Sequence, residues 1–186
     1  RHRWRATDPV DDAALASLAR VYDLTVVGRP QSGTAGPRMT TLEAVLFESG
    51  RPLLIAPPEA PRSLGERIVI SWNCSSESAR TVAYAMPLLL KAREVAVLTV
   101  EGAVAPGPSG KELADCLAAH GIEARELTAL AGGRKPGEAI LEEARRLGAD
   151  LLVKGAYTQS RLRQMIFGGA TSHILWNAEL PVFMAH

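Results

Sequence analysis

Short apolar runs rich in β-branched residues alternate with longer amphipathic stretches, most clearly in the second half of the chain. Runs with consecutive valine, isoleucine or leucine residues predict strands that are buried on both faces of a sheet. A further run alternates in polarity and predicts a less buried strand. The predicted strands are 67–71, 94–100, 123–129, 150–155 and 181–185.

The stretches between these strands carry apolar residues at helical spacing. Ser75 and Ser76 are candidate N-caps of the first helix, and Pro136 suits the first position of a later one. Gly121 and Gly148 follow the last apolar positions of two helices, where glycine commonly ends a helix. The predicted helices are 76–92, 110–121, 136–148 and 161–178.

Strands that alternate with helices indicate βαβ units and a parallel sheet. The sequence therefore predicts an α/β fold of the nucleotide-binding type, with an open five-stranded parallel sheet and helices on both faces.

An internal repeat is also present in the chain. Residues 9–28 resemble residues 136–155, and both segments end in glycine after an apolar run. Further along, residues 51–56 resemble residues 180–185. The repeat predicts two copies of one structural unit.

The two copies differ in completeness. We expect a complete unit over residues 66–186 and a linker over residues 59–65. Residues 1–58 match only the last part of that unit, so we expect them to be the C-terminal part of a first copy that lacks its first strands.

The composition narrows the class of function. The chain has 186 residues, with 21 basic and 20 acidic side chains, and this balance favours neither a nucleic-acid surface nor a membrane surface. No apolar run approaches the roughly 18 residues of a membrane span. The 2 cysteines match no metal or disulfide spacing, so we expect a reduced, cytoplasmic protein. The 4 histidines show no ligand spacing either, so no metal site is predicted.

Two loops follow predicted strand ends, where ligands bind in open α/β sheets. The first, residues 71–78, places Asn73 and several hydroxyl groups before a helix N-terminus. Free N–H groups there suit an anion, although simple N-capping by serine is the more common role. Cys74 is expected to be a small filler residue rather than a reactive thiol.

The second loop follows Gly155, where the backbone can approach a ligand without an intervening Cβ. Gly168 and Gly169 then interrupt a helical pattern. They indicate either a second helix start that faces the same ligand or a plain turn between helices, and the spacing does not separate these alternatives. Lys154 is expected to extend to solvent at the strand end rather than to face an anion.

Residues 66–186 resemble the universal stress protein family over the full length of the unit. Gly155 and Gly168 stand where its nucleotide-binding members have the first and third glycines of a phosphate-binding segment. Thr158 stands at the second glycine, and Gly169 stands where the family has serine or threonine.

The first loop departs from the family in a similar way. Asn73 stands where the family has an aspartate, and Cys74 stands at a usual glycine. An asparagine can still hydrogen-bond a ribose or an adenine edge, but it holds Mg²⁺ less strongly than a carboxylate. The resemblance implies the strand order 3-2-1-4-5, ATP as the cofactor and an uncertain role for Mg²⁺.

The residues predicted to bind the nucleotide lie in these loops and at neighbouring strand ends. They are Ser71, Trp72, Asn73, Val100, Gly155, Thr158, Ser160, Gly168, Gly169, Ala170 and Thr171.

Three functions remain open at this point. The favoured one is a stress-response regulatory protein that binds ATP or a related adenine nucleotide, because no catalytic set of residues can be placed. The second is a dimeric interaction module that has lost nucleotide binding, and the third is an adenylate-forming enzyme. The resemblance also implies that residues 52–56 meet residues 181–185, within one chain or in a homodimer through the last strands.

Overall fold

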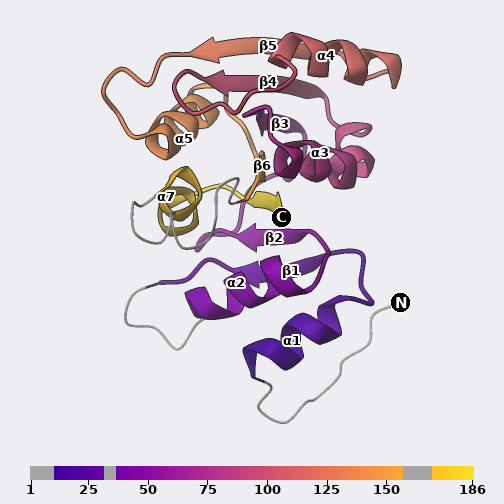
Figure 1. Ribbon diagram of the computed structural model, residues 1–186, viewed down its shortest axis with the longest axis vertical. Helices are drawn as coiled ribbons and strands as arrows, with labels where there is room; N and C mark the ends of the chain where they lie inside the picture. Colours follow the sequence, from indigo (N-terminus) through magenta and orange to yellow (C-terminus); the bar gives the residue numbers. More distant parts are fainter. Residues whose placement is uncertain (1–10, 32–36, 157–168) are drawn as a thin grey trace.

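A single seven-stranded sheet organises the protein in the computed structural model, which describes residues 11–31, 37–156 and 169–186 (Figure 1). The strand order is β1-β2-β7-β6-β3-β4-β5. The prediction of five strands is therefore wrong. The strands are β1 (Thr25–Gly28), β2 (Leu53–Ala56), β3 (Arg67–Ser71), β4 (Glu94–Val100), β5 (Ala124–Ala129), β6 (Leu151–Gly155) and β7 (Val182–Ala185).

Two strands from the first part of the chain account for the difference. Strands β5-β4-β3-β6-β7 are mutually parallel and keep the order 3-2-1-4-5 among themselves. β2 then pairs antiparallel to β7, with Leu53 opposite Met184, and β1 pairs parallel to β2. β7 would otherwise be an edge with unpaired N–H and C=O groups, and β2 satisfies them.

The predicted meeting of residues 52–56 with residues 181–185 thus forms within one chain. β7 lies between β2 and β6, so both of its edges are already paired. β7 therefore has no free edge that could pair with β7 of a second copy. The predicted homodimer through the last strands cannot form by that pairing while β2 occupies the edge.

Helices cover both faces of the sheet, as the alternating pattern predicts (Figure 1). α3 and α4 pack on one face, and α1, α2, α5 and α7 pack on the other. None of the helices in the described ranges is both long and apolar enough to cross a membrane. The helices are α1 (Asp12–Ala19), α2 (Met39–Glu48), α3 (Ser76–Leu89), α4 (Gly110–Ala119), α5 (Pro136–Arg146) and α7 (Ala170–Asn177).

Short polar contacts align the central strands. The Asp150 carboxylate, just before β6, accepts hydrogen bonds from the backbone N–H groups of Gly65, Glu66 and Arg67 at 2.9 to 3.1 Å. These bonds tie the start of β3 to the start of β6. At the other end, the Ser75 hydroxyl accepts from the Ser78 N–H and caps α3. The two contacts fix where β3 begins and where the chain turns into α3.

Candidate functional site

Three neighbouring parallel strands end along one edge of the sheet. β3 lies between β4 and β6, and Ser71, Val100 and Gly155 are the last residues of these strands. The chain leaves β3 toward β4 and β5, then continues with β6 and β7 on the other side of β3. The strand order therefore reverses between β3 and β6, which is the usual position of a ligand site in open α/β sheets.

The loop after β3 is held by polar contacts within the protein. The Asn73 Oδ1 accepts from the Ser75 hydroxyl at 2.8 Å and from the Ser75 N–H at 3.4 Å. The Asn73 carbonyl accepts from the Ala105 N–H at 2.9 Å. The Trp72 indole donates to the Pro108 carbonyl, and only 4% of this residue is exposed. Trp72 is therefore part of the core and offers no open face for a base to stack on.

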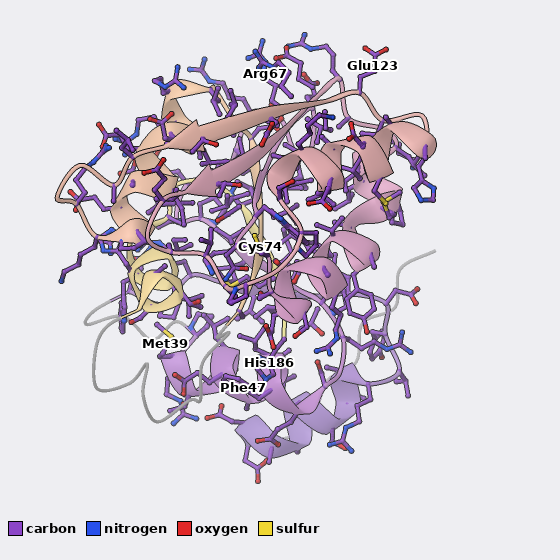
Figure 2. All side chains as sticks on the ribbon, turned by 45° about the horizontal axis from the view of Figure 1, so that its top comes forward. Met39, Phe47, Arg67, Cys74, Glu123 and His186 are labelled. Atoms are coloured by element: carbon purple, nitrogen blue, oxygen red, sulfur yellow. The ribbon has the colours of Figure 1, made fainter. Side chains whose placement is uncertain are left out.

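Cys74 has a backbone conformation that favours glycine. Its φ is +64°, a left-handed value that side chains rarely adopt. Gly107 lies against it, since a Cβ at Gly107 would be 2.4 Å from the Cys74 carbonyl oxygen. Burial raises the pKa of the Cys74 thiol, and the Glu112 carboxylate raises it further. Cys74, labelled in Figure 2, is thus a structural residue and not an activated thiol.

Gly155 is required by packing between β6 and α3. A Cβ on Gly155 would lie 2.4 Å from the Ser78 nitrogen and 2.6 Å from the Glu77 carbonyl carbon. Both atoms belong to the backbone of the first turn of α3, which has little freedom to move. The sequence suggests that this glycine lets a ligand approach, whereas the structure shows that it lets a helix approach.

Lys154 is buried at the end of β6, with 7% of the residue exposed. Its ammonium group donates to the Gly155 carbonyl at 2.7 Å and to the Thr171 hydroxyl at 3.2 Å. Burial lowers the pKa of Lys154 to about 8. The expectation that this side chain extends to solvent is wrong, because α7 covers the face of β6 on which it lies.

α7 begins beside this lysine. Gly169 is its N-cap residue, in an extended conformation with no side-chain hydrogen bond to the helix, and Thr171 lies in the first turn. A helix thus starts directly after Gly169, as both interpretations of the glycine pair require, and the residues from 157 to 168 lie outside the described ranges. Gly137 of α5 packs closely on this start, since its Cβ would be 2.7 Å from the Ala170 carbonyl oxygen.

The model of the Universal stress protein family matches residues 66–186, which is more than half of the chain. The chain belongs to this family. Stress response protein NhaX from Bacillus subtilis (strain 168) is 37% identical over 49 residues, a match that covers 26% of this chain and 30% of NhaX.

Two solved structures of universal stress proteins share the fold. One, from Archaeoglobus fulgidus DSM 4304, has a TM-score of 0.71 and 20% sequence identity. The match covers 91% of this chain and 63% of that one, so this chain spans less than two thirds of the Archaeoglobus protein. The other was solved in complex with cAMP and has a TM-score of 0.53 and 21% identity, covering 65% of this chain and 96% of that one.

The residues predicted to bind nucleotide in this universal stress protein fall into two groups. Those in the described ranges gather at the carboxyl edge of β3, β4 and β6 and at the start of α7, and they are Ser71, Trp72, Asn73, Val100, Gly155, Gly169, Ala170 and Thr171. Thr158, Ser160 and Gly168 lie outside the described residues. Reasoning from the sequence did not include Lys154 among the binding residues, although a lysine within an apolar strand is a visible signal of a buried charge.

The described side chains do not fit a divalent cation. Within the described ranges, no cluster of three or more histidine, cysteine, aspartate or glutamate side chains could hold a metal. The side-chain Oδ1 of Asn73, at the position of the family's aspartate, already accepts from the Ser75 hydroxyl. Hard cations such as Mg²⁺ favour carboxylate oxygens.

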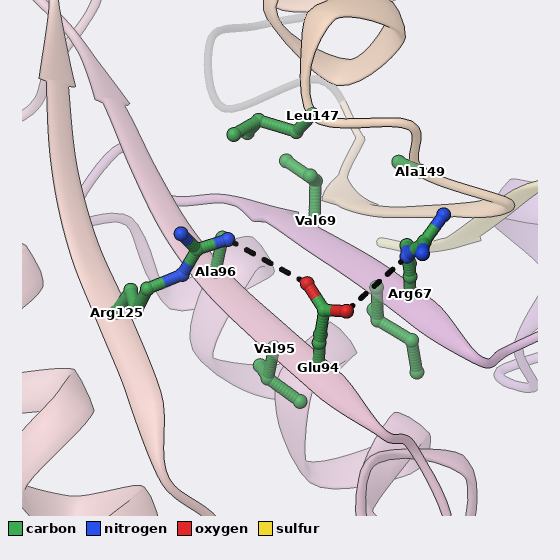
Figure 3. Close-up of a pocket in the computed structure, with 9 residues that line it drawn as sticks. Arg67, Val69, Glu94, Val95, Ala96, Arg125, Leu147 and Ala149 are labelled. Carbon is green, nitrogen blue, oxygen red and sulfur yellow. Dashed lines mark hydrogen bonds and ion pairs between the residues drawn. The ribbon is translucent and has the colours of Figure 1, made fainter.

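A small cavity lies at the opposite edge of the sheet (Figure 3). The Glu94 carboxylate there pairs with Arg67 at 3.3 Å and with Arg125 at 3.8 Å. The cavity has a volume of about 10 Å³, enough for one water molecule. A nucleotide does not fit there, and these arginines serve as surface ion pairs at the amino ends of the strands.

Proposed function

We propose that this universal stress protein binds an adenine nucleotide at the carboxyl edge of β3, β4 and β6, and that it regulates rather than catalyses. The observation that carries the proposal is the reversal of strand order between β3 and β6, with the start of α7 at the same edge. Membership of the family supports it, and so does a structurally similar universal stress protein that was solved with cAMP.

Each part of this edge has a role in the proposal. In the proposal the amide group of Asn73 contacts the ribose or the base, and Val100 borders the base from the end of β4. The N-terminus of α7, at Gly169 and Thr171, attracts phosphate through its N–H groups and helix dipole. Thr158, Ser160 and Gly168 would complete the phosphate contacts.

Gly169 offers the sharpest test. Aspartate at this N-cap position favours the helix, yet it places a carboxylate where the phosphate would bind. Serine caps the helix equally well and is the residue type that the resemblance implies at this position. Gly169→Asp should therefore abolish nucleotide binding while Gly169→Ser retains or strengthens it, with both variants at least as stable as the parent.

The measurement is isothermal titration of the purified chain with ATP, AMP and cAMP, alongside analysis of nucleotide released on denaturation. Unchanged affinity in Gly169→Asp would show that the phosphate lies elsewhere. No heat with any of the three ligands, and no released nucleotide, would overturn the proposal.

One observation favours an alternative function. Asn73 already bonds to Ser75 and Trp72 is buried, so two of the predicted binding residues have structural roles without a ligand. A chain that binds no nucleotide would then act as an interaction module of the family.

We also propose that residues 1–58 are the C-terminal part of a first copy of the unit. Its described part runs α1, β1, α2 and β2, and this succession matches α5, β6, α7 and β7 of the complete unit. β2 and β7 then occupy equivalent positions, and they pair antiparallel as related strands can.

A further inference from the structure

Lys154 carries a buried positive charge that has no carboxylate partner in the described parts of the chain. Its ammonium bonds only to a carbonyl and a hydroxyl among the described residues, and none of the ion pairs found there includes it. An ammonium taken out of water is costly unless an opposite charge compensates it. With a pKa of about 8, Lys154 is still largely charged at neutral pH.

A second positive feature adjoins this charge. The hydroxyl that Lys154 contacts belongs to Thr171, in the first turn of α7. A helix N-terminus carries a partial positive charge, so the ammonium and the helix start destabilise each other. An anion within reach of both would relieve that repulsion and the desolvation of the lysine.

The carboxylates near this edge are poorly placed to bring in a metal ion. Asn73 replaces the aspartate of the family and already bonds to Ser75. Glu77, in the first turn of α3, accepts from the Ser76 hydroxyl through Oε1, and its Oε2 is buried without a hydrogen-bond partner among the described residues. The buried Oε2 cannot be reached by a hydrated Mg²⁺, and Lys154 is the buried cation among the described residues of this edge.

We propose that Lys154 supplies the positive charge for a bound phosphate in place of a divalent cation, so that this site takes a nucleotide with a single phosphate and needs no metal. The inference rests on the proposed nucleotide site and names its ligand class. One ammonium and one helix start match the charge of one phosphate group, whereas a triphosphate brings more negative charge than they offset.

The first experiment compares ligands, with and without metal, using the unmodified chain of 186 residues. AMP and ATP are titrated calorimetrically, once with EDTA and once with excess Mg²⁺. We expect AMP to bind equally well in both buffers and more tightly than ATP in EDTA. Binding that requires Mg²⁺, or that favours ATP with Mg²⁺ over AMP, would overturn this inference and leave the proposed function intact.

The second experiment removes the charge. Lys154→Met keeps nearly the same volume, and loss of a charge-assisted contact should weaken AMP binding about 10-fold or more. Thermal unfolding should show unchanged or higher stability, because the variant no longer buries a charge. Lys91→Met, at an exposed lysine beyond α3, is the matched control and should bind AMP like the parent.

The outcomes are distinguishable. Equal AMP affinity in Lys154→Met and Lys91→Met would refute the role of Lys154 while nucleotide binding stands. No binding of either nucleotide to the unmodified chain would refute both the site and the inference.

Discussion

Replacing Gly155 by alanine should destabilise the fold because it forces β6 away from α3. The added Cβ would lie 2.4 Å from the Ser78 nitrogen and 2.7 Å from the Ser78 Cα. Non-bonded carbon atoms prefer about 3.5–4.0 Å, so strand and helix would have to separate by about 1 Å. The three nearest obstacles are backbone atoms, and no side-chain rotamer can relieve them.

The cost follows from the position of β6 in the sheet. β6 pairs with β3 and β7 and is buried along its whole length, so a shift disturbs packing on both sides. Overpacking of a core typically costs about 1–3 kcal/mol, and backbone obstruction in a central strand lies at the upper end of that range. For a domain of this size, about 3 kcal/mol lowers the melting temperature by about 6–12 °C.

Gly28 provides a matched control, because it ends β1 as Gly155 ends β6 and aligns with it in the internal repeat. A Cβ there would meet Pro37 at 3.6 Å and 3.8 Å, which is ordinary contact. Gly28→Ala should therefore change the free energy of unfolding by no more than about 0.5 kcal/mol. Urea denaturation of both variants tests the reasoning, and equal stability of Gly155→Ala and Gly28→Ala would refute it.

Three further predictions concern single residues. Cys74→Gly should match the parent or gain up to about 1 kcal/mol of stability in urea denaturation, because φ is +64°, while Cys74→Val should lose about 1–3 kcal/mol. Burial raises the pKa of Asp150, but hydrogen bonds from Ser63 and three backbone N–H groups outweigh it, so this pKa is lowered. Asp150→Asn should thus cost about 1–3 kcal/mol at pH 7. The penalty should shrink as the pH falls below the ordinary aspartate pKa of about 4 toward the lowered pKa of folded Asp150, because the unfolded chain takes up the proton first. The exposed Asp23→Asn is the control, and an equal loss would contradict the role of these bonds. Affinity for AMP should fall as the pH rises from 7 through the Lys154 pKa of about 8, because the neutral amine no longer attracts phosphate. The neighbours Ser71, Met184 and Thr171 do not titrate in this range, and a flat calorimetric profile from pH 7 to 9 would contradict the prediction.

Local patterns predict the elements well because they depend on neighbours in the chain. The runs at 67–71 and 94–100 become β3 and β4 with the same bounds. The total number of strands depends instead on which distant segments share a sheet. The pairing of β2 with β7 joins residues far apart in sequence, and hydrophobic periodicity carries no information about it.

In the candidate site, too, residue types are visible in the sequence but their packing partners are not. A glycine after a strand is visible in the sequence, but whether ligand or helix needs the space depends on how α3 packs on β6. A lysine in an apolar run is equally visible, but whether it reaches solvent depends on the cover that α7 provides. In both cases the sequence indicates that the residue is important. It does not identify the helix that packs against the residue and so determines its role.

The structural role of Gly155 changes which substitutions can test function. A Gly155 variant that loses nucleotide binding would do so through disturbed packing, so it reports on folding and not on ligand contacts. Gly169 has no side-chain cap to lose, and methionine can replace Lys154 without a large change in volume. Substitutions at these two positions therefore separate binding from stability. If Gly169→Asp and Lys154→Met both fold like the parent and both lose AMP, the phosphate must lie between the end of β6 and the start of α7.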